Sequence, residues 1–305
     1  MSEYLIVGAG PIGAAVAQQL VTQHHRVRLV TRSGSGPDHP SIERISVDAS
    51  NVDALSELAS SSAAIFNCAN PQYHRWPTDW PPIANALLGA AERSSAVLVT
   101  LSNLYAYGRP TGPLSSDAPL LADYEKAQVR ATMWRNALAA NDRGDVRATE
   151  VRASDFIGPN AQSAMGAPVI KRVLAGKRCW VLGATDQPHS WSYTEDVART
   201  LVTCAQTPEA WGQAWHAPTN RARTQRNVID DLADVAGVAH VKVSSIPSTV
   251  LRAIGLFSPM VRELPTTMYQ FTAPFVIDDG ATRLKLGLEP TPWADVLAAT
   301  LASLA

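Results

Sequence analysis

The sequence predicts an α/β fold, in which a doubly wound parallel sheet is followed by a smaller C-terminal lobe. Three observations carry this prediction. Short apolar runs alternate with longer helical patterns through the first half of the chain, an alternation typical of parallel sheets. The first apolar run breaks into a glycine-rich turn, Gly8 to Gly13. From about Phe156 onwards, tryptophan and proline become frequent and the loops lengthen.

The expected elements follow one another as in a Rossmann-like sheet. Strands are expected at residues 4–7, 26–31, 44–47, 63–67, 96–101 and 146–152. Helices are expected at residues 11–23, 51–61, 83–93 and 123–140. We therefore expect residues 1–156 to form an NAD(P)-binding Rossmann domain and residues 157–305 to form mainly a substrate-binding lobe. Within that lobe we expect short strands at residues 179–182, 214–216 and 240–243, and a helix at 194–206 that packs back on the first domain.

Composition excludes several classes of function. The 305 residues carry a formal net charge of −1 without long charged blocks, which argues against nucleic acid or an anionic membrane as a partner. No apolar stretch is long enough to span a bilayer, and a strand at residue 4 leaves no room for a signal peptide. The three scattered cysteines indicate buried thiols of a reduced, cytoplasmic protein, and no spacing suggests a metal site.

The glycine turn predicts a dinucleotide site. Gly8 permits a tight turn, Gly10 lets the backbone approach a pyrophosphate, and Gly13 lets the following helix pack closely. Pro11 and Ile12 open that helix, whose N-terminal N–H groups and dipole attract phosphate. The alternative is a purely structural glycine turn.

The end of the second strand indicates which nicotinamide cofactor is bound. An acidic residue there binds the ribose 2′-hydroxyl of NAD, whereas a nearby arginine accommodates the 2′-phosphate of NADP. Thr31 is followed by Arg32 and Ser33, so the sequence favours NADP over NAD, unless Arg32 is a solvated loop charge. Asp48 is placed either for the adenine amino group or as a helix N-cap. The other residues expected at the cofactor follow strand ends and are Ala49, Cys68, Ala69, Asn70, Ser102, Ala153, Ser154, Asp155 and Phe156.

Further segments resemble a known family. They are TLSNLYAYG at 100–108, VRASDFIGP at 151–159, WSYTEDVA at 191–198, and the tail segments at 274–278 and 286–292. Together these segments resemble the extended short-chain dehydrogenase/reductase family, in its NAD-dependent epimerase/dehydratase branch. The resemblance implies the Rossmann fold, a nicotinamide cofactor, a small-molecule substrate and a homodimer formed through long helices such as 123–140.

The chain departs from that family at its catalytic residues. The family carries a Ser or Thr four residues before a Tyr-Gly pair, then a YxxxK motif on the next helix. Here Asn103 precedes Tyr107 by that spacing, and Lys126 and Arg130 stand where the motif has Tyr and Lys. This pattern resembles the atypical members of the family, which keep the fold without the standard triad.

We therefore consider four candidate catalytic residues. Arg130 can hold the nicotinamide ribose, or a substrate carboxylate. Lys126 can donate a proton if its pKa is lowered, or is a solvated lysine. Asn103 can donate a hydrogen bond to an oxyanion. Tyr105 is the substitute acid, or a packed aromatic residue.

Aromatic residues are the candidates for the substrate pocket. His74 and Trp76 fall in a proline-rich stretch, residues 71–82, that we expect to be a stiff, apolar loop. His189, Trp191 and Tyr193 alternate, so an extended segment presents them on one face, with His189 as a second acid or base. Tyr269 is a further candidate. Each of these residues can instead be structural.

The sequence thus predicts an NADP(H)-dependent oxidoreductase or epimerase-like enzyme with a non-standard triad, acting on a small, largely apolar carbonyl or hydroxyl compound. One alternative is a non-redox cyclase, isomerase or lyase on the same fold. Another is an NADP(H)-sensing regulatory protein without turnover.

Overall fold

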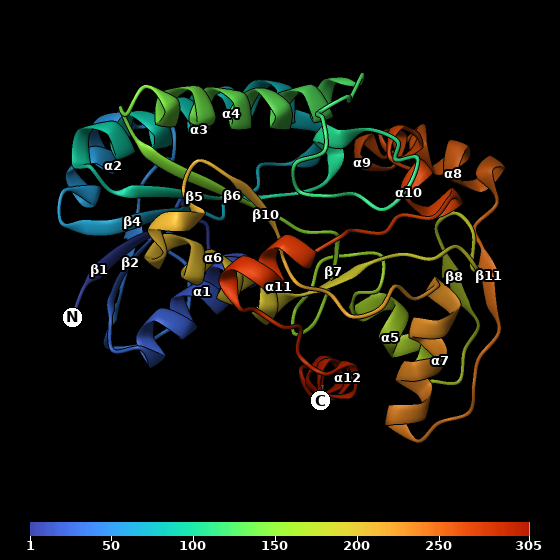
Figure 1. The fold of residues 1–305 in the computed structure, drawn as a ribbon. Helices are drawn as coiled ribbons and strands as arrows, with labels where there is room; N and C mark the ends of the chain where they lie inside the picture. The colour runs from blue at the N-terminus through green and yellow to red at the C-terminus, as the bar shows by residue number, and fades with distance from the viewer. Residues whose placement is uncertain (305) are drawn as a thin grey trace.

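A seven-stranded sheet forms the centre of the protein, in a computed structural model that describes residues 1–304 (Figure 1). Its strand order is β10-β6-β5-β4-β1-β2-β3, and every pairing is parallel. The strands are β1 (Glu3–Val7), β2 (Arg26–Thr31), β3 (Ile42–Ser46), β4 (Ser62–Asn67), β5 (Val97–Ser102), β6 (Arg147–Arg152) and β10 (Ala214–His216). The predicted doubly wound, Rossmann-like parallel sheet is confirmed.

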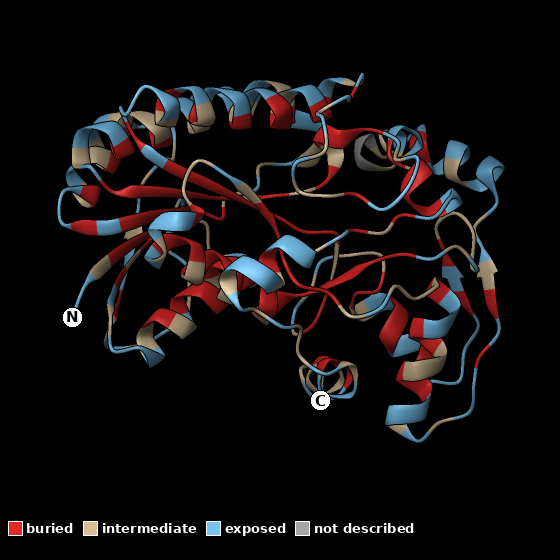
Figure 2. Ribbon diagram, in the orientation of Figure 1, coloured by how far each residue is buried: buried red, intermediate tan, exposed pale blue. Residues whose placement is uncertain are grey.

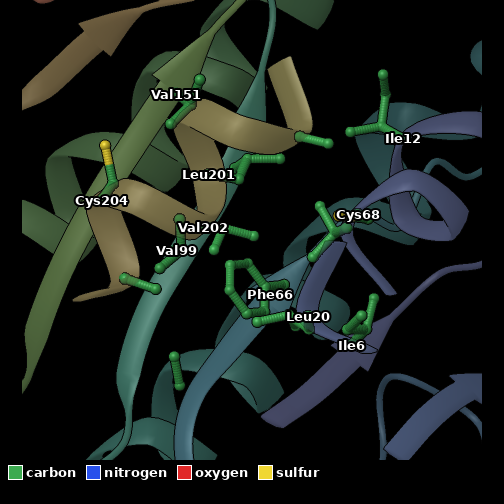
Figure 3. Packing of buried hydrophobic residues seen from close by; sticks show 14 of the residues in the cluster. Ile6, Ile12, Leu20, Phe66, Cys68, Val99, Val151, Leu201, Val202 and Cys204 are labelled. Carbon is green, nitrogen blue, oxygen red and sulfur yellow. The ribbon is translucent and has the colours of Figure 1, made fainter. Parts of the chain in front are cut away.

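Helices cover both faces of this sheet (Figure 1). One face carries α1 (Pro11–Thr22) and α6 (Thr194–Gln206), which pack against each other. The opposite face carries α2 (Val52–Ala59), α3 (Trp76–Ser94) and α4 (Glu125–Asp142). Figure 3 shows Leu20 of α1 and Val202 of α6 beside Phe66 of the sheet. Because both faces are covered, β1, β4, β5 and β6 are almost continuously buried (Figure 2), whereas the edge strand β3 is largely exposed.

Helix α3 begins earlier than the sequence predicts. Residues 71–82 were expected to form a loop, but a 3₁₀ turn, η1 (Tyr73–Arg75), leads directly into α3 at Trp76. Pro81 and Pro82 lie inside this helix, and each removes a backbone hydrogen bond. Trp76 and Trp80, one turn apart, are 3% and 0% exposed, so their burial offsets that cost and the helix continues through the prolines.

The second half of the chain contributes to both parts of the molecule. Helix α6 packs on the sheet face, and β10 joins the central sheet beside β6 rather than staying in the lobe as expected. The lobe also contains two separate parallel pairs, β7 (Asp155–Ile157) with β9 (Trp191–Tyr193) and β8 (Cys179–Val181) with β11 (Val243–Ser245). The division at residue 156 stays a prediction.

The remaining helices lie in the C-terminal half of the chain (Figure 1). They are α5 (Ala167–Leu174), α7 (Gln225–Ala236), α8 (Ser248–Gly255), α9 (Pro259–Arg262), α10 (Tyr269–Thr272), α11 (Gly280–Leu286) and α12 (Trp293–Ala302). Side chains of α5, α7 and α12 share one apolar core. Within residues 1–304, we find no helix with both the length and the apolar character needed to cross a bilayer.

Candidate functional site

The three glycines of the first turn differ in whether a larger residue would fit at each position. Gly8 has φ +105°, and a Cβ there would lie 2.5 Å from the carbonyl oxygen of Cys68. A Cβ on Gly13 would lie 1.9 Å from the carbonyl oxygen of Gly8. Gly10 has an ordinary φ of −66°, and its Cβ would meet nothing within 4 Å. Packing therefore explains Gly8 and Gly13 but leaves the glycine at position 10 unexplained by the protein alone.

Gly10 borders a cavity of about 460 Å³ at the carboxyl ends of β1, β4, β5 and β6. A second cavity of about 380 Å³ lies at the ends of β2 and β3 and shares Gly8, Ala69 and Asn70 with the first. Gly10 is also the N-cap of α1 and has no side chain to cap the helix, so the first N–H groups of α1 face this region. The two cavities therefore adjoin at these shared residues, beside the N–H groups at the start of α1.

The cavities bring together almost all the residues expected at the cofactor. The 460 Å³ cavity is lined by Gly8, Gly10, Pro11, Ile12, Gly13, Cys68, Ala69, Asn70, Ser102, Arg130, Ala153, Ser154, Asp155 and Phe156. The 380 Å³ cavity is lined by Thr31, Arg32, Asp48 and Ala49. Ser33 lies outside both, and its exposed hydroxyl group donates to Ser35 Oγ at 2.9 Å.

Two arginines reach the cavity beyond β2. Arg32 and Arg75 both line it, and the Arg75 guanidinium donates to Asp79 Oδ1 at 2.9 Å. Asp48 also lines it, with its carboxylate held by the backbone N–H and the hydroxyl of Ser50. These hydrogen bonds lower the pKa of Asp48. Asp48 is not the N-cap of α2, because Asn51 accepts the capping hydrogen bond from the Ala54 N–H.

Arg130 is a buried cation without a carboxylate in contact. It projects from α4, is 5% exposed, and contacts the edge-to-face rings of Trp76 and Trp80, with its Cζ 4.9 and 4.4 Å from the ring centres. Nη1 donates a long hydrogen bond of 3.4 Å to the carbonyl of Leu101, and Nε has no partner. Burial lowers the pKa of Arg130 to about 10. Such a side chain is short of hydrogen-bond acceptors, which a ligand in the adjoining cavity can supply.

Lys126 is turned away from the cavity. Its Nζ donates to Glu263 at 2.5 Å and lies 4.8 Å from the centre of the Tyr73 ring. The side chain is 6% exposed, so it is not a solvated lysine, and it does not belong to the lining of the 460 Å³ cavity. This ion pair joins α4 to the segment that precedes α10.

Asn103 and Tyr105 both line the 460 Å³ cavity. Asn103 Oδ1 accepts a hydrogen bond from the Tyr105 backbone N–H at 3.1 Å and so supports the 3₁₀ turn η2 (Tyr105–Tyr107). Burial raises the pKa of Tyr105 well above its usual range, so its phenol holds its proton tightly. Tyr107 is structural, because its hydroxyl contacts Arg152 Nη1 at 2.6 Å and His216 Nε2 at 2.9 Å.

Asp155 and His189 meet at the far side of the cavity. His189 Nε2 lies 3.0 Å from Asp155 Oδ2 and 3.4 Å from Ser154 Oγ, and Nδ1 lies 3.0 Å from the carbonyl oxygen of Gln270. Asp155 lines the cavity, while His189 is 2% exposed behind it. The structure thus pairs a residue expected at the cofactor with one expected at the substrate.

The other substrate candidates are placed differently. Trp76 lines the cavity, but His74 is exposed on η1 and does not. Trp191 and Tyr193 are buried in the lobe core on β9, where Trp191 Nε1 donates to the Arg223 carbonyl. Tyr269 is buried with its hydroxyl 3.3 Å from that of Tyr124. These three side chains therefore support the site from behind instead of lining it.

Eight lining residues were not among the candidates from the sequence. Ala9, Leu101 and Leu104 lie directly beside candidates in the chain, and the other five are Tyr73, Gln162, Ser163, Gln270 and Phe275. Tyr73 follows β4 closely enough to be found by its place beyond a strand end. Gln162 and Ser163 lie in a loop after β7, and the other two come from the C-terminal segment, so no local pattern places them at the sheet.

Known proteins share the fold of this chain, and the model of one family matches its sequence. The model of the NAD dependent epimerase/dehydratase family matches residues 4–216. A UDP-glucose 4-epimerase of Thermotoga maritima, solved with UDP-glucose, superposes with a TM-score of 0.80 at 16% identity, over 99% of this chain and 98% of that one. A UDP-glucuronic acid 4-epimerase of Bacillus cereus in complex with NAD gives 0.79 at 18%, over 99% and 98%. A dTDP-glucose 4,6-dehydratase of Streptomyces venezuelae with NAD bound gives 0.78 at 18%, over 99% and 96%. No curated protein matches the sequence.

Proposed function

The chain belongs to the NAD-dependent epimerase/dehydratase family, and we propose that it is an NADP(H)-dependent, epimerase-like oxidoreductase for a small, largely apolar carbonyl or hydroxyl compound. Its membership makes it an epimerase-like enzyme with a nicotinamide dinucleotide as cofactor. The observation that carries the proposal is Gly10, whose missing Cβ leaves space at the N-terminus of α1 beside the 460 Å³ cavity. That space is where a pyrophosphate approaches the backbone in a Rossmann fold.

The residues that line the two cavities fit the chemical groups of a dinucleotide. The N–H groups at the start of α1 would bind the pyrophosphate, and Asp48 would accept from the adenine amino group. Arg130 lines the 460 Å³ cavity and has a buried Nε without a partner, and its guanidinium would donate to the ribose hydroxyls next to the nicotinamide. When bound, the cofactor supplies or removes a hydride.

The lining favours a small, apolar substrate over a nucleotide sugar. Tyr73, Trp76, Tyr105, Phe156 and Phe275 surround the 460 Å³ cavity, and among its described lining residues Arg130 is the one cation. A substrate diphosphate calls for several basic groups beyond those that hold the cofactor. A flat, carbonyl-bearing molecule satisfies these walls with one or two polar contacts.

The cavity beyond β2 supports NADP(H). Thr31, at the end of β2, offers no carboxylate to a ribose 2′-hydroxyl, and Arg32 and Arg75 both line the cavity where a 2′-phosphate would lie. Asp79 engages Arg75, so Arg32 is the guanidinium with more freedom to bind the phosphate. We expect the 2′-phosphate contact to come mainly from Arg32.

Quenching of tryptophan fluorescence by NADPH and by NADH tests both parts of the proposal. Arg32→Ala should weaken NADPH binding about 10- to 100-fold, as expected for a charge-assisted hydrogen bond, and leave NADH binding unchanged. Arg44→Ala is the matched control, because Arg44 pairs with Asp38 at 3.0 Å and lies outside the cavity lining. Gly10→Ala should weaken both cofactors with little change in unfolding. Equal affinity of the wild type for NADPH and NADH refutes the NADP preference, and binding of neither refutes the oxidoreductase.

A further inference from the structure

We propose that Asp155 and His189 share one mobile proton at the wall of the cavity, and that Asp155 is the acid–base residue of the reaction. This inference rests on the proposed function, since it assigns the proton that accompanies hydride transfer. The family's tyrosine position is occupied by Lys126, whose ammonium group is engaged by Glu263. The proton must therefore come from another group at the cavity.

Counting hydrogens at the imidazole places a proton between the two residues. Nδ1 of His189 faces the carbonyl oxygen of Gln270 at 3.0 Å; a carbonyl only accepts, so Nδ1 carries a hydrogen. Nε2 faces Asp155 Oδ2 at 3.0 Å. An ionised carboxylate also only accepts, so Nε2 must then be protonated; otherwise the carboxyl group carries the hydrogen and donates it to Nε2. In either arrangement one proton lies between Nε2 and Oδ2.

The surrounding chain holds the imidazole in this position. Its ring stacks on Phe271, with centres 5.0 Å apart and planes 7° from parallel, and Phe275 lies at 5.5 Å. Backbone hydrogen bonds with Arg223 run in both directions, at 3.2 and 2.9 Å. Parallel pairing of β7 with β9 places Asp155 opposite Trp191. The imidazole is thus fixed and shielded from water, while Asp155, 22% exposed in its side chain, reaches the cavity.

Few other charged or titratable groups face this pair. Tyr105 is the phenol close enough to feel the charge of Asp155, and the same burial keeps it protonated. The Arg223 guanidinium, although its backbone pairs with His189, donates to Asp231 Oδ2 at 2.9 Å and stacks on Trp293. Apart from the Ser154 hydroxyl, whose Oγ lies 3.4 Å from Nε2, no third group competes for the shared proton among the contacts described.

The proton balance of the reaction follows from this geometry. In reduction, the substrate carbonyl carbon gains a hydride and its oxygen takes the proton from Asp155, giving the alcohol. The pair is left as an ionised Asp155 and a neutral His189 with its hydrogen on Nδ1, and a proton from solvent restores it. In oxidation, Asp155 accepts the hydroxyl proton as the hydride leaves. Asp155 is the catalytic residue here, and His189 is a positioning residue that stores the proton.

Nuclear magnetic resonance of histidine labelled with ¹⁵N and ¹³C tests the pair without any substrate. We expect a solvent-protected, downfield proton signal at neutral pH that disappears in both His189→Gln and Asp155→Asn. In Asp155→Asn, His189 should become a neutral imidazole with its hydrogen on Nδ1. The matched control is His240→Gln, because His240 forms an exposed pair with Asp234 at 2.8 Å. A neutral His189 without a shared proton in the wild type overturns the proposal.

Reduction of 4-nitrobenzaldehyde by NADPH, with cofactor binding measured in parallel, separates this proposal from the proposed function. With NADPH saturating for each protein, Asp155→Asn should reduce the aldehyde at least 100-fold more slowly than the wild type, the usual contribution of a general acid. Reduction at the wild-type rate overturns the role of Asp155. A wild type that does not bind NADPH or reduce the aldehyde counts against the proposed function, while the resonance experiment still decides whether the proton is shared.

Discussion

Replacing Arg130 by methionine should make the protein more stable without cofactor and less able to bind it. The guanidinium is 5% exposed, contacts no carboxylate, and leaves Nε unpaired. Methionine keeps a similar length and places apolar atoms against the rings of Trp76 and Trp80. Proteins commonly become more stable when an uncompensated buried charge is replaced in this way.

The magnitude follows from the pKa of Arg130. Burial lowers this pKa from 12.5 to about 10. The shift means that folding disfavours the charged guanidinium by about 3 kcal/mol. The pKa of Arg130 is lower in the folded protein than in the unfolded chain. The charged form therefore lowers the free energy of unfolding by its full amount at neutral pH, and this loss decreases only above about pH 10. Stacking on two indoles and the 3.4 Å bond to Leu101 offset about 1–2 kcal/mol. The variant should therefore gain about 1–2 kcal/mol.

Thermal unfolding with and without NADPH measures both effects. Without cofactor, Arg130→Met should unfold a few degrees higher than the wild type. Saturating NADPH should raise the Tm of the wild type by mass action and raise that of the variant much less. Arg178→Met is the control, because Arg178 stacks on Trp180 at an exposed site and should change stability by less than about 0.5 kcal/mol. A cofactor-free Arg130→Met that is destabilised by more than about 1 kcal/mol refutes the reasoning.

Two further predictions concern the scaffold. Gly13→Ala should lower the free energy of unfolding by at least about 1–3 kcal/mol, because its Cβ would lie 1.9 Å from the Gly8 carbonyl oxygen; an unchanged urea midpoint would contradict this. Burial lowers the pKa of His216 from 6.5 to about 4, so the unfolded chain binds the proton first as pH falls. Stability should therefore drop by up to about 3 kcal/mol between pH 6.5 and 4, and His216→Gln, compared by urea unfolding at each pH, should lack that part of the decrease.

Local pattern was sufficient to predict most of the sheet and its helices. Strand β2 and helix α6 have the bounds expected from the sequence, since each is a continuous periodic segment. The family resemblance inferred from the motifs is confirmed by the match over residues 4–216. The start of α3 was wrong, because prolines in the sequence argue for a loop while two buried tryptophans outweigh them. The placement of β10 was wrong because three residues carry too little signal to reveal which sheet they join.

Site residues could be predicted from the sequence only where their place at the end of a strand brings them to the cavity. Residues such as Ser102 and Asp155 follow strand ends, and the carboxyl ends of parallel strands meet at one edge of the sheet. Contacts between distant residues were not predictable. The pairing of Asp155 with His189 spans 34 positions and that of Lys126 with Glu263 spans 137, and neither has a spacing rule. The family resemblance suggests a catalytic role for position 126, but in the structure Lys126 forms an ion pair with Glu263.

The altered residue at position 126 and the proposed acid–base pair are physically connected. Lys126 binds Glu263 at 2.5 Å, and this ion pair attaches the segment before α10 to α4. Helix α10 then presents the Gln270 carbonyl to His189 Nδ1 at 3.0 Å and the Phe271 ring to its face. A residue that would donate a proton in the standard triad thus anchors the segment that fixes the hydrogen on Nδ1. With that hydrogen fixed, Nε2 is the nitrogen left to exchange a proton with Asp155. In this proposal Asp155 therefore supplies the proton that the tyrosine supplies in the standard triad.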